Sequence, residues 1–309
     1  MTVQLVVAAI ATLAVAVVLI RTLLCPRAAP ALPPIGDQAL GRAAGSEEAL
    51  SALIKIPTVS SYDAASEDAA AFAAFASEME RLYPAVHAKM DRELLGDRAL
   101  LYKWKGSDHR SLPPVILCAH YDVVPAADAQ EWERPPFSGQ IVDGEVWGRG
   151  AQDVKVIIAA ALGAAERLLA EGFKPKRTIY FAFGGDEEVG GTRGARLIAE
   201  RLASKGVQAA FLLDEGAPIA DGMLSFADRP LALVGIAEKG YIDMSIETAG
   251  AGGHASMPPR RTAAGDLARA IAAIEASRTG SRLTYTLRNF LGRLSPYSSF
   301  AMRAIFRNL

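Results

Sequence analysis

The sequence predicts an α/β catalytic domain with a helix-covered, largely parallel sheet, preceded by a transmembrane helix and followed by a smaller α+β domain. Three observations lead to this prediction. The first 20 residues carry no charged side chain, strand-like and helix-like segments alternate between residues 99 and 213, and this alternation ends after Gly216. Alternating strands and helices are typical of a parallel sheet that helices cover on its faces.

Composition excludes several classes of protein. The 309 residues are 51% hydrophobic and 22% charged, which is an ordinary globular balance and excludes wholesale disorder. The net charge of -1 offers no general basic surface, so we expect no nucleic-acid partner. Two cysteines, Cys25 and Cys118, exclude a disulfide scaffold and a cysteine-rich zinc module. With four histidines in the chain, a metal site would take most of its ligands from carboxylates.

Residues 1–24 are predicted to form a transmembrane anchor or an uncleaved signal. Twenty apolar residues in a helix span roughly 30 Å, the thickness of a bilayer's hydrocarbon core. The run is longer than a signal-peptide core and no Lys or Arg precedes it, although a cleaved signal and a buried core helix remain alternatives. Arg21 and Arg27 follow the span and, taken alone, favour a cytoplasmic side for what comes next. Residues 25–45 are proline-rich and predict a linker.

The catalytic domain is expected over residues 46–230. A first helix should follow Ser46, whose hydroxyl can cap it, and end before Pro57; a second helix is expected within residues 66–82. The expected strands are Ala99–Lys105, Pro114–Cys118, Glu145–Trp147, Arg177–Phe183 and Ala209–Leu213. The helices expected between them are Val154–Leu169 and Thr192–Ser204.

A smaller domain is expected over residues 231–309. Two strands, Leu231–Ala237 and Tyr241–Thr248, are predicted on either side of a short turn, and Thr262–Ser277 has the spacing of an amphipathic helix. An exposed edge strand in this domain would need covering, for which pairing with a second copy is one solution.

Candidate catalytic groups fall at the ends of the predicted strands, where α/β enzymes place their chemistry. These groups are His120 with Asp122, Asp153, Glu187 with Glu188, and Asp214. Taken singly, the motifs also fit a surface turn, a helix N-cap and a solvated acidic loop. Together, an imidazole and several carboxylates suit zinc, with cobalt or manganese as alternatives. So many acids favour two metal ions that share a bridging carboxylate. The HExxH and GxSxG signatures are absent.

Four motifs in order carry a family resemblance. They are His120-x-Asp-Val-Val-Pro, Gly148-Arg-Gly-x-x-Asp-x-Lys, Asp186-Glu-Glu-Val-Gly-Gly and Gly252-Gly-His-Ala-Ser-Met-Pro. The chain from about residue 46 onward thereby resembles the di-zinc aminoacylase/carboxypeptidase family, which includes acetylornithine deacetylase, succinyl-diaminopimelate desuccinylase and carboxypeptidase G. Its tail from Leu283 to Leu309 is similar to the branch of carboxypeptidase S and N-fatty-acyl-amino-acid synthase/hydrolase, whose members often begin with a hydrophobic anchor or signal.

The resemblance implies metal-dependent hydrolysis of the amide bonds of N-acyl amino acids or of the C-terminal residues of small peptides. It implies two Zn²⁺ per subunit, with Co²⁺ or Mn²⁺ possible. The implied ligands are His120 and Asp214 on one ion, Glu188 on the other, and Asp153 between them.

The same resemblance assigns the remaining roles. Glu187 would be the general base, Asp122 would steady His120, and His254 would hold the substrate carbonyl across the interface of a homodimer formed by the smaller domain. We expect a single-pass membrane protein whose catalytic domain lies on the extracytoplasmic, periplasmic side, with the orientation left open.

The chain departs from the family pattern in three places. Gly185 stands where the branch often has histidine, and Val154 stands where many members have a second aspartate. No histidine follows His254, whereas the family supplies a last metal ligand there from a later segment. We therefore expect a shortened form with an incomplete smaller domain. The alternative function is a membrane-tethered remnant that binds a ligand or partner without catalysis.

Overall fold

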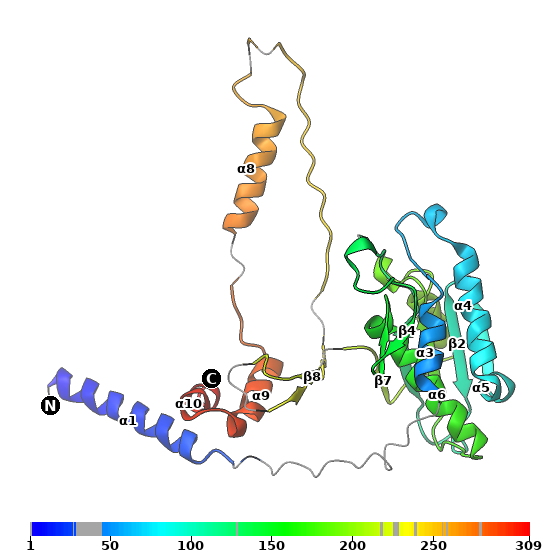
Figure 1. The fold of residues 1–309 in the computed structure, drawn as a ribbon. Coiled ribbons are helices and arrows are strands. Elements are labelled where there is room, and N and C mark those ends of the chain that lie inside the picture. Colours follow the sequence, from blue (N-terminus) through cyan, green and yellow to red (C-terminus); the bar gives the residue numbers. More distant parts are fainter. Residues whose placement is uncertain are drawn as a thin grey trace. The chain divides into compact units, whose positions relative to one another are not determined.

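The computed structural model describes two compact units. The described residues are 2–26, 28, 45–127, 129–216, 219–224, 229–237, 240–254, 256–257, 259–277 and 280–309. One unit ends at Glu215 and contains most of the predicted catalytic domain, so it is called the catalytic unit below. The second unit combines the N-terminal helix with residues from Gly216 to Leu309 (Figure 1). Most of the predicted linker over residues 25–45 lies outside the described residues.

A mixed sheet of five strands forms the centre of the catalytic unit. The strands are β1 (Asp91–Leu95), β2 (Ala99–Trp104), β3 (Val115–His120), β6 (Ile179–Gly184) and β7 (Phe211–Leu213). Their order is β1-β2-β6-β3-β7, with β2 antiparallel to both of its neighbours and β3 parallel to both β6 and β7. Four of these five strands therefore run in one direction, which confirms the largely parallel sheet.

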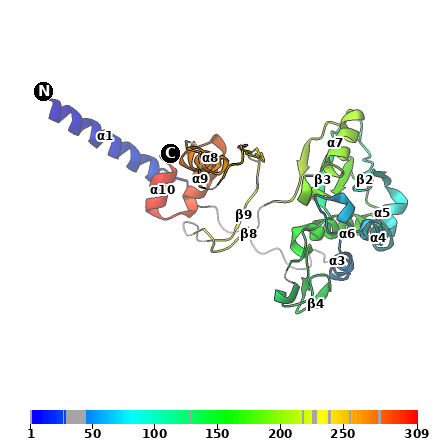
Figure 2. The same cartoon turned by 90° about the horizontal axis from the view of Figure 1, so that it is seen from above.

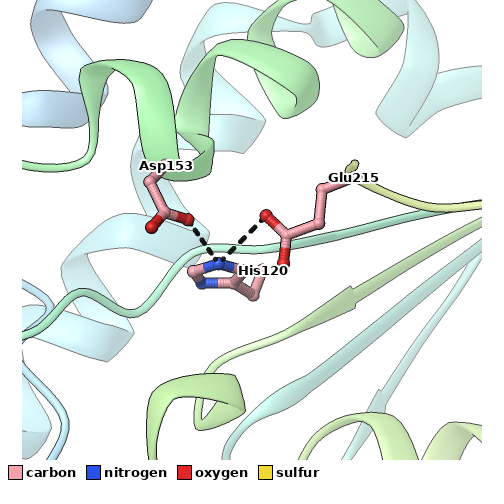
Figure 3. A group of neighbouring side chains, drawn as sticks. All are labelled: His120, Asp153 and Glu215. Carbon is pink, nitrogen blue, oxygen red and sulfur yellow. Dashed lines mark hydrogen bonds and ion pairs between the residues drawn. The ribbon is translucent and has the colours of Figure 1, made fainter. Parts of the chain in front are cut away.

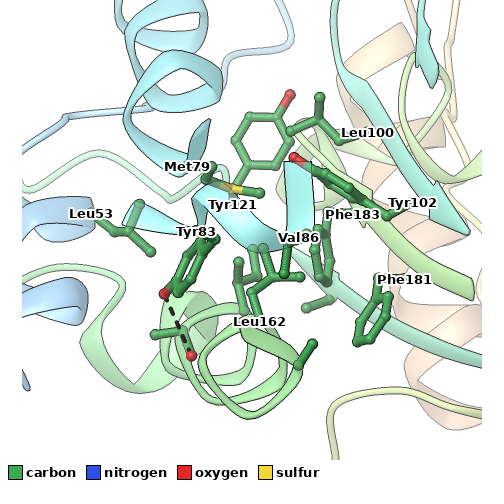
Figure 4. Packing of buried hydrophobic residues seen from close by; sticks show 14 of the residues in the cluster. Leu53, Met79, Tyr83, Val86, Leu100, Tyr102, Tyr121, Leu162, Phe181 and Phe183 are labelled. Atoms are coloured by element: carbon green, nitrogen blue, oxygen red, sulfur yellow. Dashed lines mark hydrogen bonds between the residues drawn. The ribbon is translucent and has the colours of Figure 1, made fainter. Parts of the chain in front are cut away.

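Both faces of this sheet are buried by helices. The helices packed on one face are α3 (Ser46–Ile54), α4 (Ala69–Leu82), α5 (Pro84–Lys89) and α6 (Val156–Ala170). Helix α7 (Ala195–Ser204) covers the other face (Figure 2). Because side chains alternate along a strand, Phe181 and Phe183 point into the larger core (Figure 4). Tyr180 and Ala182 pack on the other face, toward α7. This two-sided burial explains the nearly continuous apolar runs of β3 and β6.

The predicted cap of the first helix is wrong, and one predicted strand lies outside the central sheet. Gly45, with φ 85°, occupies the N-cap position of α3, and Ser46 is already the first helical residue. The predicted strand at Glu145–Trp147 exists as β5, but it pairs with β4 (Gln140–Val142) in a separate hairpin. Between this hairpin and α6 the chain makes one wide helical turn, Ala151–Lys155. Short 3-10 turns lie at Ala64–Ser66, Ala129–Glu131 and Glu187–Val189.

The second unit is mainly helical among its described residues. Its helices are α8 (Ala263–Ala276), α9 (Tyr285–Leu294) and α10 (Phe300–Phe306), with a 3-10 turn at Ser295–Tyr297. The predicted helix over Thr262–Ser277 is confirmed as α8, and the Thr262 hydroxyl accepts a hydrogen bond from Gly265 N at 3.0 Å.

The two predicted strands of the smaller domain are not formed as expected. Only Leu231–Ala232 is a strand (β9), paired with β8 (Ile219–Ala220), and the described residues of 233–248 contain none. Tyr241 and Ile242 are 85% and 77% exposed. A strand is stable when a neighbour pairs with its backbone, and this segment has no ladder partner among the described residues. The edge strand that favoured dimerisation is therefore not observed.

Helix α1 (Val3–Leu23) is the one helix of the described chain that is long and apolar enough to cross a membrane. Its length and composition fit a membrane anchor or a signal sequence. The end of α1 contacts α10 within the second unit. There Asn308 Nδ2 donates to Thr22 Oγ1 at 3.5 Å, and Cys25 Sγ lies 3.3 Å from Ser295 Oγ.

Candidate metal centre

His120 is the last residue of β3 and is 2% exposed. Its Nε2 atom lies 3.1 Å from Asp153 Oδ1, 3.5 Å from Glu215 Oε2 and 3.8 Å from Glu187 Oε2. Figure 3 shows the carboxylates of Asp153 and Glu215 approaching the imidazole from two sides. The strand end thus places one imidazole nitrogen among carboxylates that come from three different segments.

Asp153 reaches this position through a tight turn after the β4–β5 hairpin. Gly150 has φ 84°, and a Cβ there would lie 2.7 Å from Val123 Cγ1, so glycine is required both by the backbone and by the space. Lys155 fixes the other end of the turn. Its fully buried Nζ donates to the carbonyl oxygens of Leu53 at 3.0 Å and Ile56 at 2.8 Å. Burial lowers the pKa of Lys155 to about 7, although nearby Asp122 acts in the opposite direction.

Asp122 connects His120 to the acidic loop that follows β6. Its fully buried carboxylate accepts hydrogen bonds from the backbone N–H groups of Glu187 at 3.0 Å and Glu188 at 3.1 Å. His120 Nδ1 lies 3.0 Å from the Asp122 carbonyl oxygen and 3.3 Å from its Oδ1. A metal-binding histidine commonly has such an oxygen partner on its other nitrogen, and this contact leaves Nε2 facing the site.

The electrostatics of the cluster favour a cation. Burial opposes the imidazolium of His120, but Asp122, Glu215 and Glu187 outweigh it and raise the pKa of His120 to about 10. Burial, reinforced by neighbouring carboxylates and opposed by His120, also raises the pKa values of Glu187, Glu188 and Glu215. Carboxylates held this close repel one another, and a divalent metal would relieve that repulsion.

A partly buried ion-pair network supports the acidic loop on the side away from His120. Arg193 N donates to Asp186 Oδ2 at 2.6 Å, and Arg193 Nη1 donates to Glu67 Oε2 at 2.8 Å. Arg98, whose side chain is 2% exposed, donates to the same Glu67 oxygen at 2.7 Å. Arg193 and Arg98 also pair with Asp97. The network therefore connects the loop that carries Glu187 and Glu188 to the start of β2.

Two consecutive acids, Asp214 and Glu215, directly follow strand β7, and the first of them was the predicted ligand. Asp214 accepts a hydrogen bond from Glu215 N at 2.9 Å and lines the same cavity as His120. Glu215, which the sequence analysis missed, is the one that approaches His120 Nε2. Neighbouring residues of an extended segment point to opposite sides, so the pair Asp-Glu by itself does not reveal which carboxylate faces the site.

A cavity of about 420 Å³ opens beside the cluster. Its polar edge consists of His120, Glu187, Asp214 and Glu215. Its apolar wall comes from β3, β6, β7 and α7, and includes Ile116, Ala182, Ile198, Leu202 and Leu212. The arrangement places potential metal ligands at the mouth of an apolar pocket.

His254 belongs to the second unit. Its Nδ1 lies 2.8 Å from Ser256 Oγ in an exposed loop. Of the predicted site residues, His120, Asp122, Asp153, Glu187, Glu188 and Asp214 all lie in the catalytic unit. The role of His254 stays a prediction.

The donor set fits a metal ion. Within the described residues, one ligand atom from each of His120, Asp153 and Glu215 lies within 4.8 Å of the others, and the same holds for His120, Glu187 and Glu188. One imidazole with several carboxylates matches the ligands of zinc, and also accommodates cobalt or manganese. The two groups share His120, so the cluster is extended rather than a single tetrahedral set.

Comparison with known proteins gives a consistent result. The profile of peptidase family M20/M25/M40 matches residues 116–292. The chain is 42% identical over 230 residues to an N-fatty-acyl-amino acid synthase/hydrolase of Xenopus tropicalis, covering 74% of this chain and 44% of the relative. It is 41% identical over 242 residues to a probable carboxypeptidase S-like protein of Dictyostelium discoideum, covering 77% and 46%.

Among solved structures, an M20 family metallo-carboxypeptidase from Sulfolobus solfataricus aligns with a TM-score of 0.45 and 23% identity over 56% of this chain and 38% of that one. The two relatives named above are about twice as long as the matched region, so the chain spans about half the length of the curated relatives it matches.

Proposed function

Because the chain belongs to peptidase family M20/M25/M40, we propose that it carries the metal-binding catalytic unit of an amide-bond hydrolase. The substrates would be N-acyl amino acids or small peptides cleaved at their C-terminal residue, the classes named in its relatives. The observation that carries this proposal is the convergence of His120, Asp153, Glu187 and Glu215 at the mouth of an apolar cavity.

In this proposal two zinc ions would be held by His120, Asp153, Glu188 and Asp214, and Asp153 would serve both ions. Four carboxylates, those of Asp153, Glu187, Glu188 and Glu215, lie around the one imidazole, which is more than a single tetrahedral zinc uses and supports a second ion. Glu215 is the alternative to Asp214, because its carboxylate is the one near His120. Zinc, when bound, supplies a Lewis acid that activates water and polarises the scissile carbonyl.

Glu187 is the proposed general base. Its side chain is 52% exposed, so a water molecule can reach it, and it extends to within 3.8 Å of His120 Nε2. The raised pKa of Glu187 makes its carboxylate a better proton acceptor than an ordinary glutamate. It would take a proton from the attacking water and return it to the leaving amine nitrogen.

Asp122 and His254 have supporting roles in the proposal. Asp122 orients the His120 ring through Nδ1 and fixes the backbone of Glu187. His254 would hold the substrate carbonyl from the partner subunit of a homodimer. Mixing a Glu187→Gln chain with a His254→Ala chain checks this role, because activity should return in mixed dimers and stay absent if each chain completes its own site.

The decisive experiment compares Glu187→Gln with wild type for both metal content and turnover. We expect zinc stoichiometry to be retained and hydrolysis of a panel of acyl amino acids and dipeptides to fall by roughly 10²–10⁴. Glu200→Gln, whose exposed side chain pairs with Arg196 on α7, is the matched control and should leave both unchanged. Unaltered turnover in Glu187→Gln would remove the base assignment. A wild-type chain that binds zinc but cleaves no member of the panel would favour the ligand-binding alternative.

We also propose that α1 anchors the protein in a membrane with the catalytic unit on the extracytoplasmic side. Its length and apolar composition support an anchor. Alkaline extraction of membranes distinguishes an anchored chain from a released one, and protease protection in sealed vesicles reports the side on which the catalytic unit lies.

A further inference from the structure

The chain after Glu275 is strongly basic. It contains six arginines and no aspartate or glutamate; these arginines are Arg278, Arg282, Arg288, Arg293, Arg303 and Arg307. In the described part of this segment, Arg282, Arg288 and Arg293 are exposed. Large apolar side chains are exposed beside them, namely Tyr285, Leu287, Phe300, Ile305 and Leu309. Arginines interleaved with exposed aromatic and aliphatic side chains are typical of helices that lie in a membrane interface.

Contacts with α1 place this basic segment at a defined depth. The 21 residues of α1 rise about 31 Å, close to the thickness of the hydrocarbon core. If α1 crosses a bilayer, its last turn with Thr22 therefore reaches the headgroup level. Thr22 is 1% exposed and contacts Asn308 just after α10, and Cys25 contacts Ser295 just after α9. Both C-terminal helices thus adjoin the point at which α1 leaves the apolar layer.

We propose that α9 and α10 lie on the membrane surface beside α1 and bind anionic phospholipid headgroups through the exposed Arg282, Arg288 and Arg293. The inference rests on α1 spanning the bilayer and is independent of the proposed hydrolase activity. A lipid surface fits the exposed arginines and apolar side chains of this segment better than a second copy of the chain does. An isologous contact would bring the same arginines of two copies together with no acidic residue in the segment to pair with them.

The test uses the full chain in nanodiscs of phosphatidylcholine alone or mixed with phosphatidylglycerol at about 7:3. An environment-sensitive fluorophore is attached at Leu287→Cys, with both native cysteines replaced by serine. We expect spin-labelled lipids to quench this fluorophore in the anionic discs, and about 0.5 M salt to reduce the quenching. The same label at Ile274→Cys on α8, where the native side chain is 49% exposed, should not respond to phosphatidylglycerol.

Charge variants identify the groups responsible. Each basic residue near an anionic surface strengthens association about fivefold, so Arg288→Gln with Arg293→Gln should weaken local partitioning by roughly 25-fold. Arg196→Gln with Arg260→Gln removes the same charge from elsewhere on the exposed surface and should have no effect. Equal quenching in neutral and anionic discs, or a label open to aqueous quencher in both, would overturn the proposal. Shielding from both quenchers together with cross-linked pairs of chains would overturn it in favour of self-association.

Discussion

Replacing Glu67 by glutamine should destabilise the catalytic unit by about 3–5 kcal/mol. The Glu67 side chain is 1% exposed, and its carboxylate accepts three hydrogen bonds, from Arg98, Arg193 and Ser61 N. Two of these bonds come from guanidinium groups, and each bond to a charged group contributes about 1.5–3 kcal/mol. Removing the carboxylate also leaves Arg98 buried without its main counter-ion, a change that typically costs 3–5 kcal/mol.

Urea denaturation followed by tryptophan fluorescence measures this change directly. Trp104, Trp132 and Trp147 all lie in the catalytic unit, so the fluorescence signal reports on that unit even in the full chain in detergent. Glu200→Gln is the matched control, because its side chain is 60% exposed in an i,i+4 pair and should matter by about 0.3–0.5 kcal/mol. A loss below about 1 kcal/mol in Glu67→Gln would refute the reasoning.

The same substitution carries a pH signature. Burial acts to raise the pKa of Glu67, but hydrogen bonds from Arg98, Ser61 N and Arg193 outweigh it and hold the pKa below 4.5. A carboxyl whose pKa is lowered by folding stabilises the folded state above its unfolded pKa and loses this contribution as pH falls through the folded value. The stability gap between wild type and Glu67→Gln should therefore be constant above about pH 5 and close below 4.5. A gap that closes near neutral pH would contradict the assignment.

Three further predictions test the packing and chemistry of the site. Gly185→Ala would place a Cβ 2.5 Å from Tyr121 Cζ and should lower stability by about 1–3 kcal/mol in thermal denaturation. Its control is Gly163→Ala on α6, where the new Cβ meets no atom and stability should rise by about 1 kcal/mol. Asp122→Asn should weaken zinc binding about 10–100-fold in a chelator competition, and unchanged affinity would exclude its orienting role. Burial raises the pKa of Cys118 to about 12, so alkylation at pH 8 should be at least tenfold slower in the native chain than in urea.

The strands of the central sheet could be predicted where burial on both faces produces a continuous apolar run in the sequence. Strands β3 and β6 lie between two helical layers, so their continuous apolar runs identify them. Strand β1 was missed because Asp91–Leu95 is an edge strand that begins with three consecutive charged residues and has only two leucines. The residues 241–248 have a strand-like pattern, but a pattern does not supply the neighbouring backbone that a strand requires.

The candidate site could be predicted because its groups stand at strand ends and turns. The structure brings ligand atoms of Asp153, Glu187 and Glu188 close to His120, while the roles of these residues stay predictions. Asp153 follows the separate β4–β5 hairpin and not a strand of the central sheet. The Gly-rich turn before Asp153 does not indicate which sheet the preceding strand belongs to. The burial of charged side chains could not be predicted. Lys155 belongs to a family motif, but its burial has no signature there, and nothing in the pattern around Arg98 distinguishes it from an ordinary surface residue.

The exposed end of the sheet has a practical consequence for handling the protein. Phe211, Leu212 and Leu213 in β7 are each more than half exposed, and within the described chain no strand pairs with the outer side of β7. Such an edge offers free backbone groups together with apolar side chains, which is a template for intermolecular β-pairing. Concentrated preparations of this chain should therefore form oligomers rich in β-structure over days. Phe211→Lys adds a charge to this edge outside the cavity wall and should slow such association.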